Sequence, residues 1–140
     1  MDDDPFDLKR FVAAQDPVWD RVRAELAQGE KRSHWMWFVF PQIAGLGHSP
    51  TARAYAISSR EEARAYLAHS VLGPRLREST ALVNAVAGRS AERILGGIDA
   101  MKFRSSMTLF AEVAPEEPLF RRALEKYFGG EKDRVTLEKL

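Results

Sequence analysis

Hydrophobic residues recur along this chain at spacings of three and four, which is the pattern of helices that bury one face. Leu8, Phe11 and Val12 illustrate it, and no stretch alternates polar and apolar residues as a strand would. Helices are predicted at 7–15, 17–28, 52–56, 59–67, 73–87, 100–110, 119–128 and 133–140, with a short turn at 90–95. The pattern predicts an all-α protein, a single compact multihelical domain of about eight short helices over residues 1–140.

Residues that begin and end helices support these boundaries. Short polar side chains cap a helix by accepting a hydrogen bond from an early backbone N–H, and glycine ends it by adopting a left-handed conformation. Ser59 and Glu62 also have the spacing of a capping box. The predicted caps are Asp16, Ser33, Ser49, Ser59, Ser90, Asp99 and Asp133, and the predicted stops include Gly29, Gly88 and Gly129.

The most apolar stretch is the central aromatic segment 33–42, which reads SHWMWFVFPQ. Its apolar run is far shorter than the roughly 20 residues that span a bilayer, so it predicts a buried core element. Ser33 as a cap favours a short helix here. Pro41 disfavours helical geometry at the preceding residue, so that helix should end at Phe40. Periodicity over so few residues leaves a buried strand as the alternative.

Composition narrows the function classes. Charged residues make up 29% of the chain and the formal net charge is +1, so nucleic acid is not an expected partner and no membrane-binding surface is predicted. The absence of cysteine excludes disulfides and thiol catalysis, and it fits a reducing compartment. The acidic start of the chain lacks the basic and apolar regions of a signal peptide. We therefore expect a soluble cytoplasmic protein.

No metal or cofactor motif is present, so neither is expected. The three histidines, His34, His48 and His69, are widely separated and form neither HxH nor HxxxH spacing. The glycine loop at 45–47 reads GLG, which lacks the remaining glycine of a phosphate-binding GxGxxG, and no GKS or GKT follows. These glycines predict a tight turn or a close backbone approach.

Several motifs resemble the signature of a bacterial family catalogued as family 1810 among the domains of unknown function. They are KRSHWMWFVFPQ at 31–42, KFRSSMTLF at 102–110 and KYFGG at 126–130, with shorter matches that extend the resemblance over nearly the whole chain. The resemblance implies a single multihelical domain and brings no established activity. Some members carry the label calpastatin, which implies calpain inhibition. Such inhibitors resemble disordered repeats, whereas this chain is rich in core-forming aromatic residues.

One candidate site is formed by Lys102, Ser105 and Ser106, which share a face of the helix that begins near Asp99. A lysine and hydroxyls beside free backbone N–H groups at a helix start suit an anion or a phosphate. In the alternative, Lys102 pairs with Asp99 and the serines bond back to helix carbonyls. A Ser–Lys nucleophilic pair is a further, minor hypothesis.

Residues of the central aromatic segment supply the other candidates. His34 is a candidate acid, base or orienting group because imidazole titrates near neutral pH. Gln42 is a candidate hydrogen-bonding group beside a cavity, and Trp35 and Trp37 are candidate stacking walls for a base or sugar ring. In the alternative, His34 and Gln42 stabilise turns, and both tryptophans belong to the core.

Two hypotheses of different classes follow. The first is a small cytoplasmic domain that binds a small anionic or nucleotide-like ligand between Lys102 and the segment 34–42, with catalysis left open. The second is a protein-interaction module without a pocket or an activity, which predicts an exposed apolar patch supplied by the helix of Tyr127 and Phe128 or by the aromatic run. The sequence leaves the ligand and the oligomeric state open.

Overall fold

The computed structural model describes residues 3–140, whose regular secondary structure is helical apart from one isolated backbone bridge. The prediction of an all-α, multihelical domain is confirmed, and several of its helices are short segments of four or five residues. The helices are α1 (Lys9–Gln15), α2 (Trp19–Gln28), α3 (Met36–Val39), α4 (Pro50–Ala54), α5 (Arg60–Ala68), α6 (Leu72–Ala85), α7 (Ala91–Leu95), α8 (Gly97–Val113), α9 (Pro118–Phe128) and α10 (Arg134–Glu138), with a 3-10 turn at Asp16–Val18.

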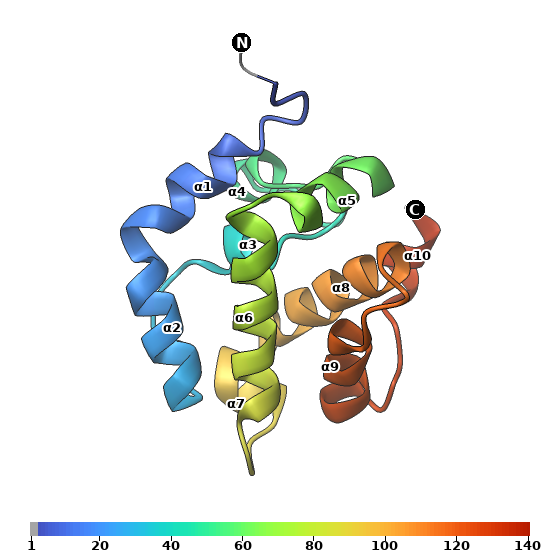
Figure 1. Cartoon of the computed structure of the whole chain (residues 1–140). Coiled ribbons are helices and arrows are strands. Elements are labelled where there is room, and N and C mark those ends of the chain that lie inside the picture. Colours follow the sequence, from blue (N-terminus) through green and yellow to red (C-terminus); the bar gives the residue numbers. More distant parts are fainter. Residues whose placement is uncertain (1–2) are drawn as a thin grey trace.

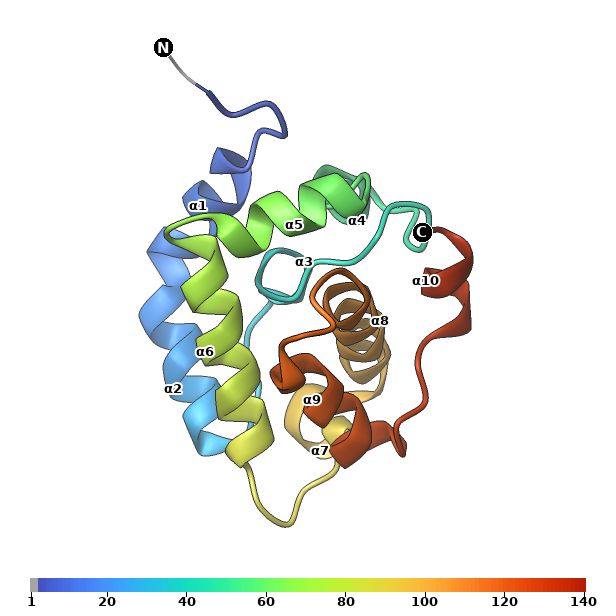
Figure 2. The same ribbon diagram turned by 45° about the vertical axis from the view of Figure 1, so that its right-hand side comes forward.

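Helix α8 is the longest helix and lies at the centre of the arrangement (Figures 1 and 2). It packs against α5, α7, α9 and α10, while α2 and α6 lie side by side along another flank. The α8 residues from Ser105 to Ala111 are all buried, as is typical of a helix that other elements surround on every side. The first turns of α8 are different, because they leave Ile98 and Met101 exposed.

Within the central aromatic segment, Met36–Val39 forms helix α3, and Phe40 is its C-cap residue directly before Pro41, so the helix stops where predicted. Trp35, Val39 and Phe40 are each no more than 2% exposed. The ring of Phe40 meets the ring of Phe103 in α8 edge to face, with 4.9 Å between their centroids. The segment is therefore a buried helix that joins the N-terminal helices to α8, and the strand alternative is excluded.

Most of the predicted helix ends are present. Serine and aspartate side chains accept a hydrogen bond from an early N–H of α4, α5, α7 and α10, and left-handed glycines end α2 and α9. These residues are Ser49, Ser59, Ser90, Asp133, Gly29 and Gly129. The local chemistry of the chain thus accounts for many of the helix boundaries.

Three predicted caps are wrong because tertiary partners take their side chains. Asp16 lies within the 3-10 turn and pairs with Arg75 at 2.8 Å. Ser33 donates its hydroxyl proton to Glu25 instead of capping α3. Asp99 is the third residue of α8, since that helix begins at Gly97, and its carboxylate pairs with lysines.

We predict that Gly73→Ala destabilises the protein although alanine favours helices by about 1 kcal/mol over glycine. A Cβ at Gly73 in α6 would lie 2.2 Å from the backbone oxygen of Leu67 and 2.8 Å from the Arg77 guanidinium. Forcing these atoms apart should cost more than the propensity gain, for a net loss of about 1–3 kcal/mol in urea unfolding. The control is Gly97→Ala in α8, where a Cβ meets nothing within 4 Å. An equal gain in stability for both variants would contradict this account.

Candidate functional site

The segment between α3 and α5 closes on itself through the isolated bridge between Ile43 and Ile57. The N–H of Ala44 donates to the Ile57 carbonyl, and the N–H of Ile57 donates to the Gln42 carbonyl, each over 2.8 Å. These two bonds fix both ends of the loop that carries α4. The loop consequently forms a preformed rim around a hollow next to α3.

That hollow, named here the Trp37 cavity, has a volume of about 290 Å³. Its side-chain walls are Trp37 and Tyr55, with the amide of Gln42 and the exposed side chains of Arg53 and His48. The remaining lining is Ile43, Ala44, Gly45, Gly47, Ala52 and Ala56. No carboxylate occurs among these lining residues, and the cationic Arg53 makes no ion pair with any described residue.

The glycines of the GLG loop allow close approach at this rim. Gly45 has a φ of +97°, and a Cβ there would lie 3.0 Å from the aliphatic carbons of Lys139 and 3.2 Å from its Nζ. A Cβ at Gly47 would lie 2.6 Å from the Cβ of Ala52. The loop therefore packs directly onto α4 and brings the Lys139 ammonium beside the cavity rim.

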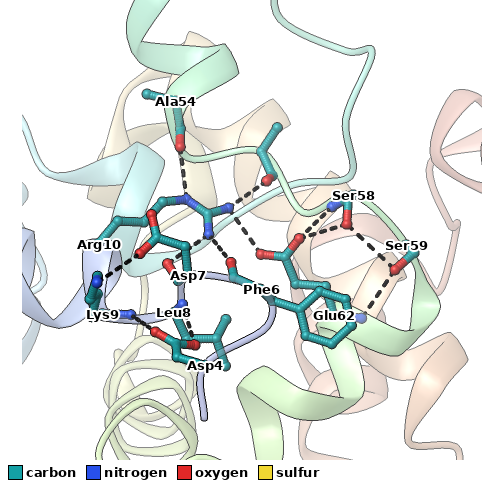
Figure 3. Close-up of polar contacts among 11 residues, drawn as sticks. Asp4, Phe6, Asp7, Leu8, Lys9, Arg10, Ala54, Ser58, Ser59 and Glu62 are labelled. Atoms are coloured by element: carbon teal, nitrogen blue, oxygen red, sulfur yellow. Dashed lines mark hydrogen bonds and ion pairs between the residues drawn. The ribbon is translucent and has the colours of Figure 1, made fainter. Parts of the chain in front are cut away.

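Arg10, which is partly exposed, forms an ion pair with the buried Glu62 (Figure 3). The guanidinium donates to the carbonyls of Ala54 and Ala56, on either side of Tyr55, and to the Glu62 carboxylate over 2.9 Å. Two further bonds reach the carbonyls of Phe6 and Asp7 in the N-terminal segment. Arg10 thereby fixes the backbone around Tyr55 against α1 and α5.

Glu62 is 3% exposed at its side chain and is saturated with donors. One carboxylate oxygen accepts from the N–H and the hydroxyl of Ser58, and the other accepts from Arg10. The predicted capping box is therefore only half formed. Ser59 caps the N–H of Glu62, but the Glu62 carboxylate bonds to Ser58 rather than to the Ser59 backbone.

Lys102 lies next to Trp37, one of the cavity walls, and to Asp99. Its Nζ is 4.5 Å from the centroid of the Trp37 ring and 3.6 Å from a carboxylate oxygen of Asp99. The other Asp99 oxygen pairs with Lys31 at 2.8 Å, and the Lys31 side chain is only 6% exposed. Two ammonium groups thus share one carboxylate beside the tryptophans, which leaves this cluster with a net positive charge.

A second hollow, named here the Lys102 groove, adjoins the Trp37 cavity and has a volume of about 380 Å³. It shares Gln42, Gly45 and Gly47 with the cavity, and its other lining residues are Leu46, Ile98, Met101, Lys102, Ser105, Asp133 and Val135. The groove differs from the cavity in chemistry, because it has an apolar rim and contains the carboxylate of Asp133.

Four of the residues predicted for the site come together here, namely Trp37, Gln42, Lys102 and Ser105. Lys102 is the sixth residue of α8, so it lies beyond the free N–H groups of the helix start that were expected beside it. It also pairs with Asp99, as the alternative predicted. The Ser105 hydroxyl bonds back to the Met101 carbonyl, which is likewise the alternative, and it also bonds to Asp133.

The other three predicted residues lie elsewhere. Trp35 is 1% exposed and offers no open face, because it packs in the core and donates its indole proton to Glu25. Ser106 is fully buried in α8, and its hydroxyl has no partner among the described residues. His34 is exposed, and none of the described hollows includes it in its lining.

The family comparison agrees with the resemblance noted in the sequence. The model of the family described as "Protein of unknown function (DUF1810)" matches residues 5–140. The chain belongs to this family. Among curated proteins no match is found. Within residues 3–140, no helix has both the length and the apolar content to cross a membrane, and no three side chains of the metal-binding types gather around a common point.

A solved structure of a similar protein agrees with this fold. The crystal structure of the conserved hypothetical protein Rv1873 from Mycobacterium tuberculosis shares 59% sequence identity with the chain and has a TM-score of 0.97. The alignment covers 98% of each chain. The arrangement of helices described above is therefore shared with that mycobacterial protein.

Several residues around the Trp37 cavity were not predicted from the sequence. Arg53 and Tyr55 enter the cavity only because the Ile43–Ile57 bridge folds the loop back, and a single backbone bridge leaves no alternating pattern to detect. Arg10 carries no local signal, since its partners at positions 54, 56 and 62 are far away in sequence. Glu25 was likewise not predicted from the sequence.

Glu25 anchors the chain where it enters the central aromatic segment. Its carboxylate accepts hydrogen bonds from the backbone N–H groups of Arg32 and Ser33, the Ser33 hydroxyl and the Trp35 indole. Burial alone would raise the pKa of this carboxyl, but these donors outweigh it and lower the pKa of Glu25 to about 2. The ionised carboxylate therefore fixes Trp35 and, through the short helix α3, the position of Trp37.

Proposed function

We propose that this protein binds a small anionic, nucleotide-like ligand in the Trp37 cavity. The observation that supports this most directly is the combination of two aromatic walls, one amide and an arginine without an ion pair among residues 3–140, in a hollow whose lining has no carboxylate. Small-molecule sites are typically concave and mostly apolar, with a few polar groups that fix orientation. The expected occupant is a flat ring that carries an acidic group.

Each lining group has a chemical role in this proposal. The ring of the ligand packs on Trp37 or Tyr55, where stacking on an aromatic residue contributes about 1–3 kcal/mol per base. The Gln42 amide supplies one donor and one acceptor for the edge of the ring. Arg53 binds the acidic group, because a guanidinium matches carboxylate and phosphate oxygens in a two-point contact.

Two lysines outside the cavity also favour a negatively charged ligand. Lys102 lies against Trp37, and Lys139 lies beside Gly45 at the rim. Their fields add to that of Arg53 and raise the local concentration of an anion. We accordingly retain Lys102 and Ser105 as neighbours of the site, and we leave His34, Trp35 and Ser106 outside it.

The size of the cavity limits the ligand. Its volume of about 290 Å³ is close to the lower end of the roughly 300–1,000 Å³ usual for ligand sites, so a mononucleotide or a smaller compound is favoured over a dinucleotide. The absence of cysteine fits a cytoplasmic setting. The proposal concerns binding, and incubation of any confirmed ligand with the protein, followed by product analysis, tests turnover.

The first test is a thermal-shift screen with nucleoside monophosphates, the matching nucleosides, ribose 5-phosphate and inorganic phosphate. A ligand at 100 times its dissociation constant adds about 2.7 kcal/mol, which should raise Tm by several degrees. Only compounds with both a ring and an acidic group are expected to produce the full shift.

Variants then locate the site. Arg53→Ala should weaken binding about 10–100-fold in calorimetry, because it removes a charge-assisted contact of about 1.5–3 kcal/mol. Trp37→Leu should weaken it by a similar factor. The matched control is Arg64→Ala, which removes an exposed arginine from α5, outside the cavity. A flat screen would overturn the proposal, as would binding that survives both Arg53→Ala and Trp37→Leu unchanged.

A further inference from the structure

Three strongly exposed apolar side chains line one groove, two at the start of α8 and one on α10. Ile98 is 75% exposed, Met101 is 73% exposed and Val135 is 44% exposed. This is not the patch that the interaction hypothesis expected. Tyr127 and Phe128 are only partly exposed and pack against the core, and the aromatic run is largely buried.

This face carries a projection and a hollow next to each other. Ile98 and Met101 project from α8, and the same two residues form part of the wall of the Lys102 groove. Val135 of α10 contributes another part of the wall, and Leu46 contributes a third. A methionine side chain is flexible and fills irregular apolar space well. The projecting residues thus have the chemistry that the adjoining groove would accept.

The groove also holds one charge of each sign. Lys102 shares Asp99 with Lys31, so the positive charge of this cluster is only partly compensated. Asp133 uses one oxygen to accept from Ser105 and Thr136, and its second oxygen has no partner among the described residues. The groove is therefore lined by Lys102, whose charge is only partly neutralised, and by Asp133, whose second oxygen has no partner among the described residues.

We infer that this face forms a two-fold interface with a second copy of the chain. In a two-fold interface the same patch meets itself, so residue i contacts residue j and j contacts i. Met101 and Ile98 of each copy then enter the groove of the other, and Lys102 of each copy faces Asp133 of the other. A partner that carried a single sign of charge would leave one of these two groups unpaired, which is costly once water is excluded.

Sedimentation velocity over a wide range of protein concentration tests this inference. We expect a concentration-dependent monomer–dimer equilibrium for the unaltered chain. Met101→Glu places a charge in the interface at a position that is 73% exposed in the monomer, so the fold should persist. It should weaken dimerisation by more than about tenfold. The matched control, Ala24→Glu on the exposed face of α2, should leave the equilibrium unchanged.

A charge-reversal pair separates this arrangement from other dimers. Lys102→Glu alone and Asp133→Lys alone should each impair self-association, because like charges then meet at both contacts. When the two variants are mixed, both contacts become attractive again, and a heterodimer should form. A monomer at every concentration would overturn the inference. So would a dimer that is insensitive to Met101→Glu, or a mixture of folded Lys102→Glu and Asp133→Lys chains that forms no heterodimer. These outcomes are independent of ligand binding.

Discussion

Glu25→Ala is expected to lower the free energy of unfolding by about 3–5 kcal/mol. The change leaves the Trp35 indole, the Ser33 hydroxyl and two backbone N–H groups without their acceptor, and Trp35 lies in the core at 1% exposure. For a chain of 140 residues, Tm should fall by roughly 10–20 °C. Urea unfolding followed by tryptophan fluorescence measures both the loss and the altered surroundings of Trp35.

The acid response of the same carboxylate gives an independent measurement. The pKa of Glu25 is about 2 in the folded protein and near its ordinary value of 4.5 in the unfolded chain. Its contribution is therefore complete above about pH 4.5 and disappears as the pH falls from there toward 2, an effect of up to about 3 kcal/mol. Glu25→Gln should flatten this part of the stability profile.

Glu78→Gln is the matched control, because that glutamate is 43% exposed in its pair with Arg23. Its stability profile between pH 4.5 and 2 should stay close to that of the unaltered protein, since surface pairs contribute at most about 1 kcal/mol. If Glu25→Gln kept the full acid sensitivity, the carboxylate would not be the group that anchors the aromatic segment in its ionised form.

Glu25 also shows why part of the fold is hidden from the sequence. Apolar spacing predicts the helices because burial of one helix face is a local, periodic requirement, and serine and glycine set many of the ends through local hydrogen bonds. Glu25 lies on α2 among other charged residues, and nothing local distinguishes it from a solvated glutamate. Its role arises when the chain turns back at Gly29 and presents donors from 32–35 to it.

The candidate site, like the fold, is only partly predictable from the sequence. Trp37, Gln42 and Lys102 are predictable as polar and aromatic groups at the edges of apolar helices, and they do lie close to one another. Arg53 and Tyr55 cannot be predicted as site residues, because it is a single backbone bridge that brings their loop onto α3. Trp35 and Trp37 are two residues apart and point to different environments, the core and the cavity. Helical spacing alone cannot distinguish them, since each falls beside apolar neighbours.

Arg10→Met should destabilise the protein by about 3 kcal/mol, the lower end of the range for a fully buried ion pair that loses one partner, because the Arg10 side chain is 22% exposed. The Glu62 carboxylate would be left at 3% exposure with Ser58 as its remaining donor, and the carbonyls of Ala54 and Ala56 would lose the donor that Arg10 supplies. Arg64→Met on the exposed face of α5 is the control and should change stability by less than about 0.5 kcal/mol.

A double-mutant cycle with Glu62→Gln isolates the ion pair from the carbonyl contacts. The double variant should be more stable than the sum of the single losses predicts, with an interaction energy of about 1–3 kcal/mol, because the uncompensated charge is gone.

Arg10→Lys keeps the charge but cannot reach Ala54, Ala56 and Glu62 together, so it should retain more stability than Arg10→Met. Tyr55 should then be less firmly held in the cavity wall. Any ligand confirmed in the Trp37 cavity should consequently bind Arg10→Lys more weakly at a temperature where that variant is fully folded. Unchanged affinity would show that Arg10 stabilises the fold without positioning the site.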